Sequence, residues 1–312
     1  MSGDGGSARR TVVVTGASAG LGYHAAEQLA AAGHRVVLAS RDAERGAAAE
    51  HSIRRRVPDA DLGRVRLDLA DLDSVGAAAR ELASDEPDGV DALLNNAGVV
   101  GAPSPRRTAQ GTELQMGTNH VGHVAWTALN LPLLERRAGR VVHLGSIAHR
   151  GAYLDRDDPL GVGHYSSHRQ YARSKLAVML FGFELAERLA DAGSSVSSVV
   201  AHPGLSLDVL TPARPEVTAS RSEPTWTRPA RLPVLRPFVQ GKDAGAAPLV
   251  HAAVGDDVRS GEYWGPSGWM QLRGPAARVG AAARAHDRTE AARLWAASER
   301  AAGVAFALDA LG

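Results

Sequence analysis

Residues 11–32 read TVVVTGASAGLGYHAAEQLAAA, and this stretch decides the fold. Thr11–Thr15 is a β-branched run typical of a strand, and an apolar helical pattern follows the glycines at 16, 20 and 22. A strand, a glycine turn and a helix in this order point backbone N–H groups and the positive end of a helix at a phosphate. A plain strand-to-helix turn is the alternative, because the spacing G-x-x-x-G-x-G differs from the usual dinucleotide fingerprint G-x-G-x-x-G.

The alternation of strand and helix continues along the rest of the chain. At this spacing it predicts an α/β fold, with a parallel sheet of about seven strands and helices on both faces. The further predicted strands are 35–39, 65–67, 90–94, 141–144, 195–201 and 262–264. The further predicted helices are 43–57, 72–82, 108–137, 165–190, 241–254 and 287–300.

The composition is that of an ordinary globular protein, with 44% hydrophobic and 22% charged residues. A net charge of +1 with scattered basic residues argues against a nucleic-acid partner. The chain has no cysteine, so disulfides and thiolate chemistry are excluded, and no apolar run reaches membrane-spanning length. We therefore expect a cytoplasmic protein with a disordered, Gly/Ser-rich lead-in at 1–8 and a single domain at 9–312.

The end of the second predicted strand, Ser40-Arg41-Asp42, bears on the choice of dinucleotide. At this place an acid accepts the 2′-hydroxyl of NAD, whereas an arginine accommodates the 2′-phosphate of NADP. A small hydroxyl residue followed by Arg41 favours NADP. Two alternatives stay open: Asp42 could cap the next helix, and Arg41 could be a plain surface charge.

Tyr171 and Lys175 lie four residues apart on the predicted helix 165–190, and therefore on one face of it. A neighbouring cation favours the phenolate and brings the pKa of a tyrosine toward working pH. The pair can then act as a general acid and base. Taken alone, a packing tyrosine beside a solvated lysine is the alternative.

Two other polar residues stand out. Asn119 lies inside an apolar helical stretch, where asparagine has poor propensity; either a local kink that frees a carbonyl or partial exposure would explain it. Ser146 follows the fifth predicted strand, at the edge where open parallel sheets bind ligands. His120 and His123 have no third ligand spaced with them, so we predict no metal site, and we expect His149 to be structural.

In this order and spacing the motifs resemble the short-chain dehydrogenase/reductase superfamily. They are TGASAGLG (15–22), NNAG (95–98), the asparagine in TNHVGH, the serine after RVVHLG, YARSK (171–175) and His202-Pro203-Gly204. The resemblance covers Arg10 to about Gly204, and it is strongest to the retinol-dehydrogenase-like branch, which handles lipophilic carbonyls. The C-terminal segments GEYWGPSGWMQLRGP and ARLWAASE are similar to that branch as well.

The resemblance implies a single Rossmann-type doubly wound domain that binds NADP(H). It implies an oxidoreductase that reduces a carbonyl of a bulky lipophilic small molecule or oxidises the matching alcohol, with a homodimer expected by analogy. Tyr171 would transfer the proton, Lys175 would lower its pKa and bind the nicotinamide ribose, Ser146 would hold the substrate oxygen, and Asn119 would support a water relay to Lys175. The cofactor would be held by Gly16, Ser18, Gly20, Leu21, Gly22, Ser40, Arg41, Asp68, Leu69, Asn95, Ala97, Gly98, Tyr171, Lys175, Pro203, Gly204 and Ser206.

One position and one segment depart from the family pattern. A threonine is expected five residues after Pro203, but the chain has Asp208, so Ser206 or a backbone N–H would have to replace its hydroxyl. Residues 205–240 carry six prolines and are too long for a passive connector. We predict a substrate lid whose apolar wall is Leu205, Leu207, Leu210, Trp226 and Leu232; a disordered insertion is the alternative.

Two other functions stay open at this stage. The same Tyr/Lys pair could serve a biosynthetic tailoring enzyme that catalyses a non-redox or redox-neutral epimerisation, elimination or cyclisation. A dinucleotide-sensing protein without activity could keep the fold, because fold alone does not fix function.

Overall fold

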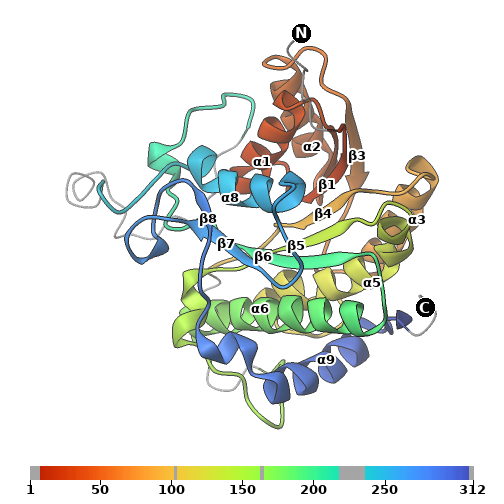
Figure 1. Cartoon of the computed structure of the whole chain (residues 1–312), viewed down its shortest axis with the longest axis vertical. Helices are drawn as coiled ribbons and strands as arrows, with labels where there is room; N and C mark the ends of the chain where they lie inside the picture. Colours follow the sequence, from red (N-terminus) through yellow and green to blue (C-terminus); the bar gives the residue numbers. More distant parts are fainter. Residues whose placement is uncertain (1–7, 102–103, 162–164, 218–235, 309–312) are drawn as a thin grey trace.

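The computed structural model describes residues 8–101, 104–161, 165–217 and 236–308. Within these ranges the strands form one eight-stranded sheet in the order β3-β2-β1-β4-β5-β6-β7-β8 (Figure 1). All neighbours are parallel except β7 and β8, as the strand and helix alternation predicts. The strands are β1 Thr11–Thr15, β2 Arg35–Ser40, β3 Leu62–Arg66, β4 Ala92–Asn95, β5 Arg140–Leu144, β6 Ser197–Ala201, β7 Tyr263–Pro266 and β8 Ala276–Arg278.

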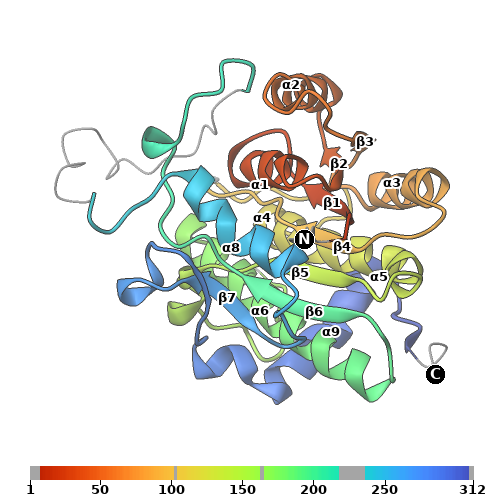
Figure 2. The same cartoon turned by 45° about the horizontal axis from the view of Figure 1, so that its top comes forward.

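Helices cover both faces of the sheet (Figures 1 and 2). One layer consists of α1 Gly20–Ala31, α2 Ala43–Arg54 and α8 Lys242–Val254. The other consists of α3 Leu72–Asp85, α5 Gly122–Glu135, α6 Ser167–Asp191 and α9 Arg288–Ala302, with the short α4 Leu114–Met116 ahead of α5. No helix in the described part of the chain is both long enough and apolar enough to cross a bilayer.

The period of two along the strands explains why the sheet is covered twice. In β1, Val12 and Val14 pack into the core under α1 and α8, whereas Val13 packs into the core under α3 and α5. All three valines are fully buried. Strands that are apolar on both faces must be covered on both faces, and this requirement selects the doubly wound arrangement.

Most predicted ends lie within one to three residues of the observed ones, and three differences from the sequence prediction are informative. β3 starts at Leu62 rather than Val65. Gly63 and Arg64 carry no strand signal in the sequence, and in this edge strand neither of them is fully buried. β8 was not predicted, since its three residues, AAR, carry no strand signal. The helix predicted for 108–137 begins only at Leu114, because Arg107 and Glu113 pair across a turn.

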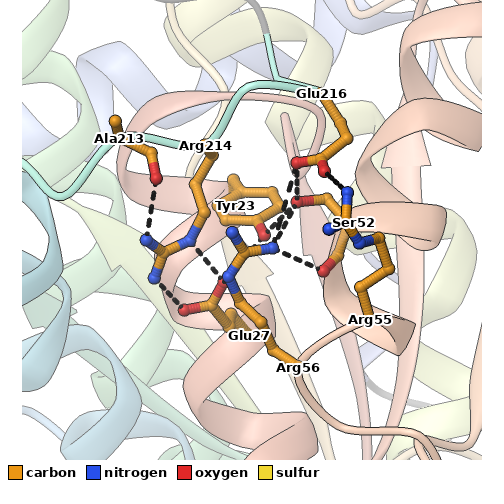
Figure 3. A network of polar contacts seen from close by, with 8 residues as sticks. All are labelled: Tyr23, Glu27, Ser52, Arg55, Arg56, Ala213, Arg214 and Glu216. Carbon is orange, nitrogen blue, oxygen red and sulfur yellow. Dashed lines mark hydrogen bonds and ion pairs between the residues drawn. The ribbon is translucent and has the colours of Figure 1, made fainter.

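The segment after β6 is fastened to the α1 and α2 layer by a polar network (Figure 3). Arg214 donates from Nε and Nη2 to the two carboxylate oxygens of Glu27, at 2.8 and 2.5 Å. Glu27 also accepts from the Tyr23 hydroxyl at 2.7 Å. Two residues further on, Glu216 accepts from Ser52 at 3.2 Å and pairs with Arg55. Within the predicted lid, Arg214 and Glu216 therefore lie against the layer formed by α1 and α2.

The other end of the predicted lid is fixed as well. Ser206 and Gln240 form a parallel bridge, in which Leu207 N donates to Gln240 O at 2.9 Å. Gln240 also donates from its side chain to the Pro203 carbonyl at 2.9 Å. Residues 218–235, with the predicted wall residues Trp226 and Leu232, lie outside the described residues, as do residues 1–7 of the predicted lead-in.

We expect Arg214→Ala to lower the free energy of unfolding by about 1–2 kcal/mol, because Glu27 would lose a bidentate partner in a poorly hydrated position. Both side chains of the pair are less than one-fifth exposed. Urea denaturation would measure the loss. Arg288→Ala is the matched control, since its pair with Glu187 is mostly exposed and should contribute less than about 0.5 kcal/mol. Equal losses of unfolding free energy in the two variants would contradict a stabilising role of the Arg214–Glu27 pair.

Candidate active site

A cleft of about 750 Å³ opens where the parallel strands end. It lies at the carboxyl edge of β1, β2, β4 and β5, on both sides of the point where the strand order reverses between β1 and β4. Open α/β sheets bind their ligands at this place. Of the predicted site residues, those that line the cleft are Gly16, Ser18, Gly20, Leu21, Ser40, Arg41, Asp68, Leu69, Ala97, Gly98, Tyr171, Lys175 and Ser206.

The glycine turn fits a diphosphate. Gly16 has φ +69°, and a Cβ atom there would lie 2.9 Å from the Ala97 Cα. A Cβ on Gly22 would lie 2.3 Å from the Asn96 side chain, so Gly22 is needed for close packing behind the turn rather than for lining the cleft. The N-cap of α1 is Ala19, which offers no capping side chain, and the first turn has no acidic residue. The first N–H groups of α1 are therefore available to an external anion.

The second strand ends in a basic corner. Asp42 caps α2, accepting from Glu44 N at 3.0 Å and Arg45 N at 3.1 Å, as one of the two sequence alternatives had it. Ser40, Arg41 and Arg45 all line the cleft. Arg45 was not predicted from the sequence. It lies one helical turn after the cap residue Asp42, and this spacing could have indicated that its side chain lies on the same side of α2 as the cap.

The last three residues of the NNAG motif, Asn96, Ala97 and Gly98, line the cleft, whereas Asn95 does not. Asn96 Nδ2 donates to the Thr15 carbonyl at 2.8 Å, and Asn96 N donates to the Thr15 hydroxyl at 2.9 Å, which joins the ends of β1 and β4. Asn96 lines the cleft. Asn95, the residue singled out from the sequence, is buried behind it and donates to Thr127 at 2.9 Å, so its contact is with α5.

Tyr171 and Lys175 come together at the other end of the cleft. Both lie on α6, and Lys175 Nζ is 5.9 Å from the centre of the Tyr171 ring. Ser146 hydrogen-bonds the side chain of Tyr171, although it is set back from the cleft lining. Lys175 is 3% exposed and donates to the Leu144 carbonyl at 2.8 Å. The structure thus places a phenol, a serine hydroxyl and an ammonium around one point.

Burial is the largest influence on the pKa values of Tyr171 and Lys175. It raises the pKa of Tyr171, and the hydrogen bond with Ser146 opposes that effect. Burial lowers the pKa of Lys175 to about 7. The expectation that Lys175 depresses the pKa of Tyr171 is therefore not met in this structure. The physical reason is that a buried lysine with a carbonyl partner carries less charge at neutral pH and so stabilises a phenolate less.

Asn119 lies in a π-helical turn, Gly117–Val121, and is buried, which favours the local helix irregularity over partial exposure, the other alternative left open by the sequence. Its side chain accepts from Val99 N at 2.8 Å and donates to the Ser174 hydroxyl at 2.9 Å, next to Lys175. Its carbonyl is 3.1 Å from Nδ1 of His123, whose Nε2 is 2.9 Å from the Thr15 hydroxyl. Asn119 is buried behind the cleft, and its contacts brace the helix that carries the tyrosine and lysine.

His149 contacts backbone groups through both nitrogens of its ring. His149 Nδ1 lies 2.6 Å from the Ser146 carbonyl, and Nε2 accepts from Ala282 N at 3.2 Å. These two partners require the proton on Nδ1, and the ring therefore ties the serine loop to the C-terminal part of the chain. Within the described ranges, no three or more His, Asp or Glu side chains are placed to hold a metal ion.

The loop after β6 supplies a feature that the sequence analysis missed. Pro203 and Gly204 do not line the cleft; the Pro203 carbonyl accepts from the Ser206 hydroxyl at 2.9 Å. Asp208, at the unusual position, pairs with Lys242 at 2.5 Å, and both residues line the cleft. A lysine at the start of the predicted helix 241–254 was visible in the sequence, but nothing local linked it to the cleft.

Sequence and structure comparisons agree on the relationship. The profile of the short chain dehydrogenase family matches residues 10–219. Human retinol dehydrogenase 13 is 34% identical over 301 residues, which cover 95% of this chain and 85% of that protein. Bovine dehydrogenase/reductase SDR family member 13 is 38% identical over 306 residues, which cover 96% of this chain and 75% of that protein.

Two solved structures extend the comparison to the fold. An uncharacterized protein from Mycobacterium paratuberculosis superposes with a TM-score of 0.75 at 35% identity, covering 96% of this chain and 95% of that one. The Pseudomonas aeruginosa RhlG/NADP active-site complex superposes with a TM-score of 0.63 at 25% identity, covering 83% and 95%. The chain therefore belongs to the short-chain dehydrogenase family, as a retinol-dehydrogenase-like NAD(P)-dependent oxidoreductase.

Proposed function

We propose that the protein is an NADPH-dependent reductase of a carbonyl group on a bulky, lipophilic small molecule, or a dehydrogenase of the matching alcohol. The observation that carries the proposal is the grouping of Tyr171, Ser146 and Lys175 at one end of a cleft whose other end is the glycine turn. Asn119, behind the cleft, braces the helix that positions them.

When bound, the nicotinamide ring supplies or accepts the hydride. In reduction the Tyr171 hydroxyl donates its proton to the carbonyl oxygen, and the Ser146 hydroxyl holds that oxygen by a hydrogen bond. Because burial raises the pKa of Tyr171, the phenol remains protonated at neutral pH, which suits the acid that reduction needs. Oxidation of an alcohol needs the phenolate instead, and so it is favoured at alkaline pH.

The preference for NADPH over NADH rests on the basic corner after β2. Arg41 and Arg45 both reach the cleft where the adenosine ribose is expected, and Asp42 is engaged as a helix cap rather than offered to a 2′-hydroxyl. The related RhlG structure, by its description, contains NADP. A phosphate between two guanidinium groups receives charge-assisted hydrogen bonds that a hydroxyl cannot match.

We expect Arg41→Ala to raise the Kd for NADPH about tenfold while the Kd for NADH changes less than about twofold, since only NADPH carries the 2′-phosphate. Titration followed by nicotinamide fluorescence measures both constants. Arg54→Ala at the far end of α2 is the control, because Arg54 does not line the cleft. A parallel loss of NADPH and NADH affinity in Arg41→Ala would count against a role at the 2′-phosphate.

The lipophilic substrate class is supported by the surface beside the catalytic end. Val100 lines the cleft and is about half exposed, and Leu207 lines it from the loop after β6. The turn that carries the exposed Trp269 and Met270 is fastened to that loop, since Leu205 N donates to the Leu272 carbonyl at 2.7 Å. Apolar surface of this extent favours an apolar ligand. The name of the related retinol dehydrogenases agrees with such a substrate.

The test is a titration with NADPH and NADH, followed by a panel of bulky ketones and aldehydes with absorbance read at the reduced nicotinamide band. Tight NADPH binding with oxidation on at least one carbonyl is the expected result. Binding without oxidation, together with product formed at constant NADPH, would replace the proposal with a redox-neutral reaction at the same site. Binding without any chemistry would favour a dinucleotide sensor.

A further inference from the structure

The chain is almost free of lysine. Lysine and arginine together number 35, and only Lys175 and Lys242 are lysines. Both of them line the cleft. The proposed function assigns a role to Lys175, which lies beside Tyr171, but it assigns none to Lys242. A compact, flexible ammonium differs from the forked guanidinium used elsewhere in this chain, so its placement asks for a function.

Lys242 lies over the glycine turn. It is the first residue of α8, which packs along α1, and its backbone N donates to the Thr211 hydroxyl at 2.8 Å. Its Nζ and Cδ atoms are 3.7 and 3.8 Å from the point where a Cβ on Gly20 would lie. Gly20 begins α1. The ammonium is therefore close to the helix end that attracts a phosphate.

Asp208 holds the ammonium at this place. The pair measures 2.5 Å, and the two side chains are only 14% and 19% exposed, so water screens the interaction weakly. A dinucleotide that enters the cleft brings its negative diphosphate toward a carboxylate. That approach is unfavourable unless a cation lies between the two anions.

We infer that Lys242 is a ligand of the cofactor's diphosphate and that Asp208 is the counter-ion that positions it. The inference rests on the proposed function, since it needs a dinucleotide in the cleft. It gives a role to the aspartate at a position where the family resemblance implies a hydroxyl, because Asp208 positions a cation there. Because NADH and NADPH share the diphosphate, the contribution of Lys242 must be equal for both, unlike that of Arg41.

The decisive comparison is between Asp208→Asn and the double variant Asp208→Asn/Lys242→Met. Neither leaves a carboxylate stranded beside the diphosphate, so their difference reports on the ammonium itself. Fluorescence titration should give a Kd about tenfold higher in the double variant for NADPH and NADH alike, and competition should give the same ratio for ADP-ribose. Equal affinities in the two variants would overturn the inference and reduce Lys242 to a partner that merely neutralises Asp208.

Chemical labelling provides a readout that does not depend on substitution. With two lysines in the chain, acylation followed by mass spectrometry reports on each one separately. ADP-ribose, which carries the diphosphate without nicotinamide, should slow the labelling of Lys242 severalfold; unchanged labelling at saturating ADP-ribose would contradict the contact. If the wild-type protein bound no dinucleotide, the proposed function and the inference would fail together. Binding and turnover with an unaffected Lys242→Met variant would overturn the inference alone.

Discussion

Replacing Tyr171 with phenylalanine is expected to lower the turnover number by about three orders of magnitude while the Kd for NADPH stays within about a factor of two. The variant keeps the ring, its half-buried packing and the shape of the cleft, and loses only the hydroxyl that hydrogen-bonds Ser146. Without that proton donor the developing alkoxide has no acid beside it. Single-turnover absorbance measures the hydride step, and fluorescence titration measures binding.

Tyr153→Phe is the matched control for this experiment. Tyr153 is 67% exposed and does not line the cleft. The centre of its ring lies 3.3 Å from the guanidinium carbon of Arg284. The same chemical change there should leave turnover within a factor of two. A Tyr171→Phe variant with full activity would show that the proton comes from elsewhere, and a variant that had also lost NADPH binding would show that the cleft itself had been disturbed.

Replacing Lys175 with methionine is expected to abolish most of the activity and, in the same protein, to raise stability at neutral pH. The ammonium is buried and its pKa is lowered to about 7 from 10.5, so the native state holds its charge at a cost. Methionine removes that cost but leaves the Leu144 carbonyl without this donor. We expect a net gain of about 2 kcal/mol at pH 7, seen as a thermal midpoint higher by about 3 °C.

The pH dependence gives this prediction its internal control. Because the native pKa is lower than the unfolded one, the unfolded chain binds more protons between pH 7 and pH 10.5, and the wild-type protein gains stability from this group as pH rises through that window. The advantage of Lys175→Met should therefore be largest at pH 7 and below, and vanish toward pH 10.5. A variant less stable than wild type at pH 7 would mean that the Leu144 hydrogen bond outweighs the buried charge.

The fold could be predicted because its signals are local. β1, the glycine turn and α1 follow one another within a few residues. The consecutive valines of β1 indicate a strand that is covered on both faces, and all three are buried. β8 escaped because an edge strand of three residues is defined by its neighbour β7 and not by its own composition. The delayed start of the helix before Asn119 has the same cause, a pairing between Arg107 and Glu113 that no local pattern reveals.

The candidate site could be predicted in part for a related reason. Motif residues such as Tyr171 and Lys175 share one helix, so their proximity follows from sequence spacing. Lys242 and Asp208 are far apart in the sequence and meet only because α8 packs on α1. The direction in which the pKa of Tyr171 shifts could not be predicted from the sequence either, since it depends on how deeply the residue is buried in the folded protein.

The anchoring of residues 206–217 and of Gln240 has a consequence for how the cleft can be altered by mutation. Arg214 and Glu216 fix the segment after β6 to α1 and α2, and the Ser206–Gln240 bridge fixes the beginning of that segment. Leu207 and Asp208, which line the cleft, lie between these two attachments. Substitutions of the α1 and α2 residues that bind Arg214 and Glu216 are therefore expected to reach the cleft lining from outside it.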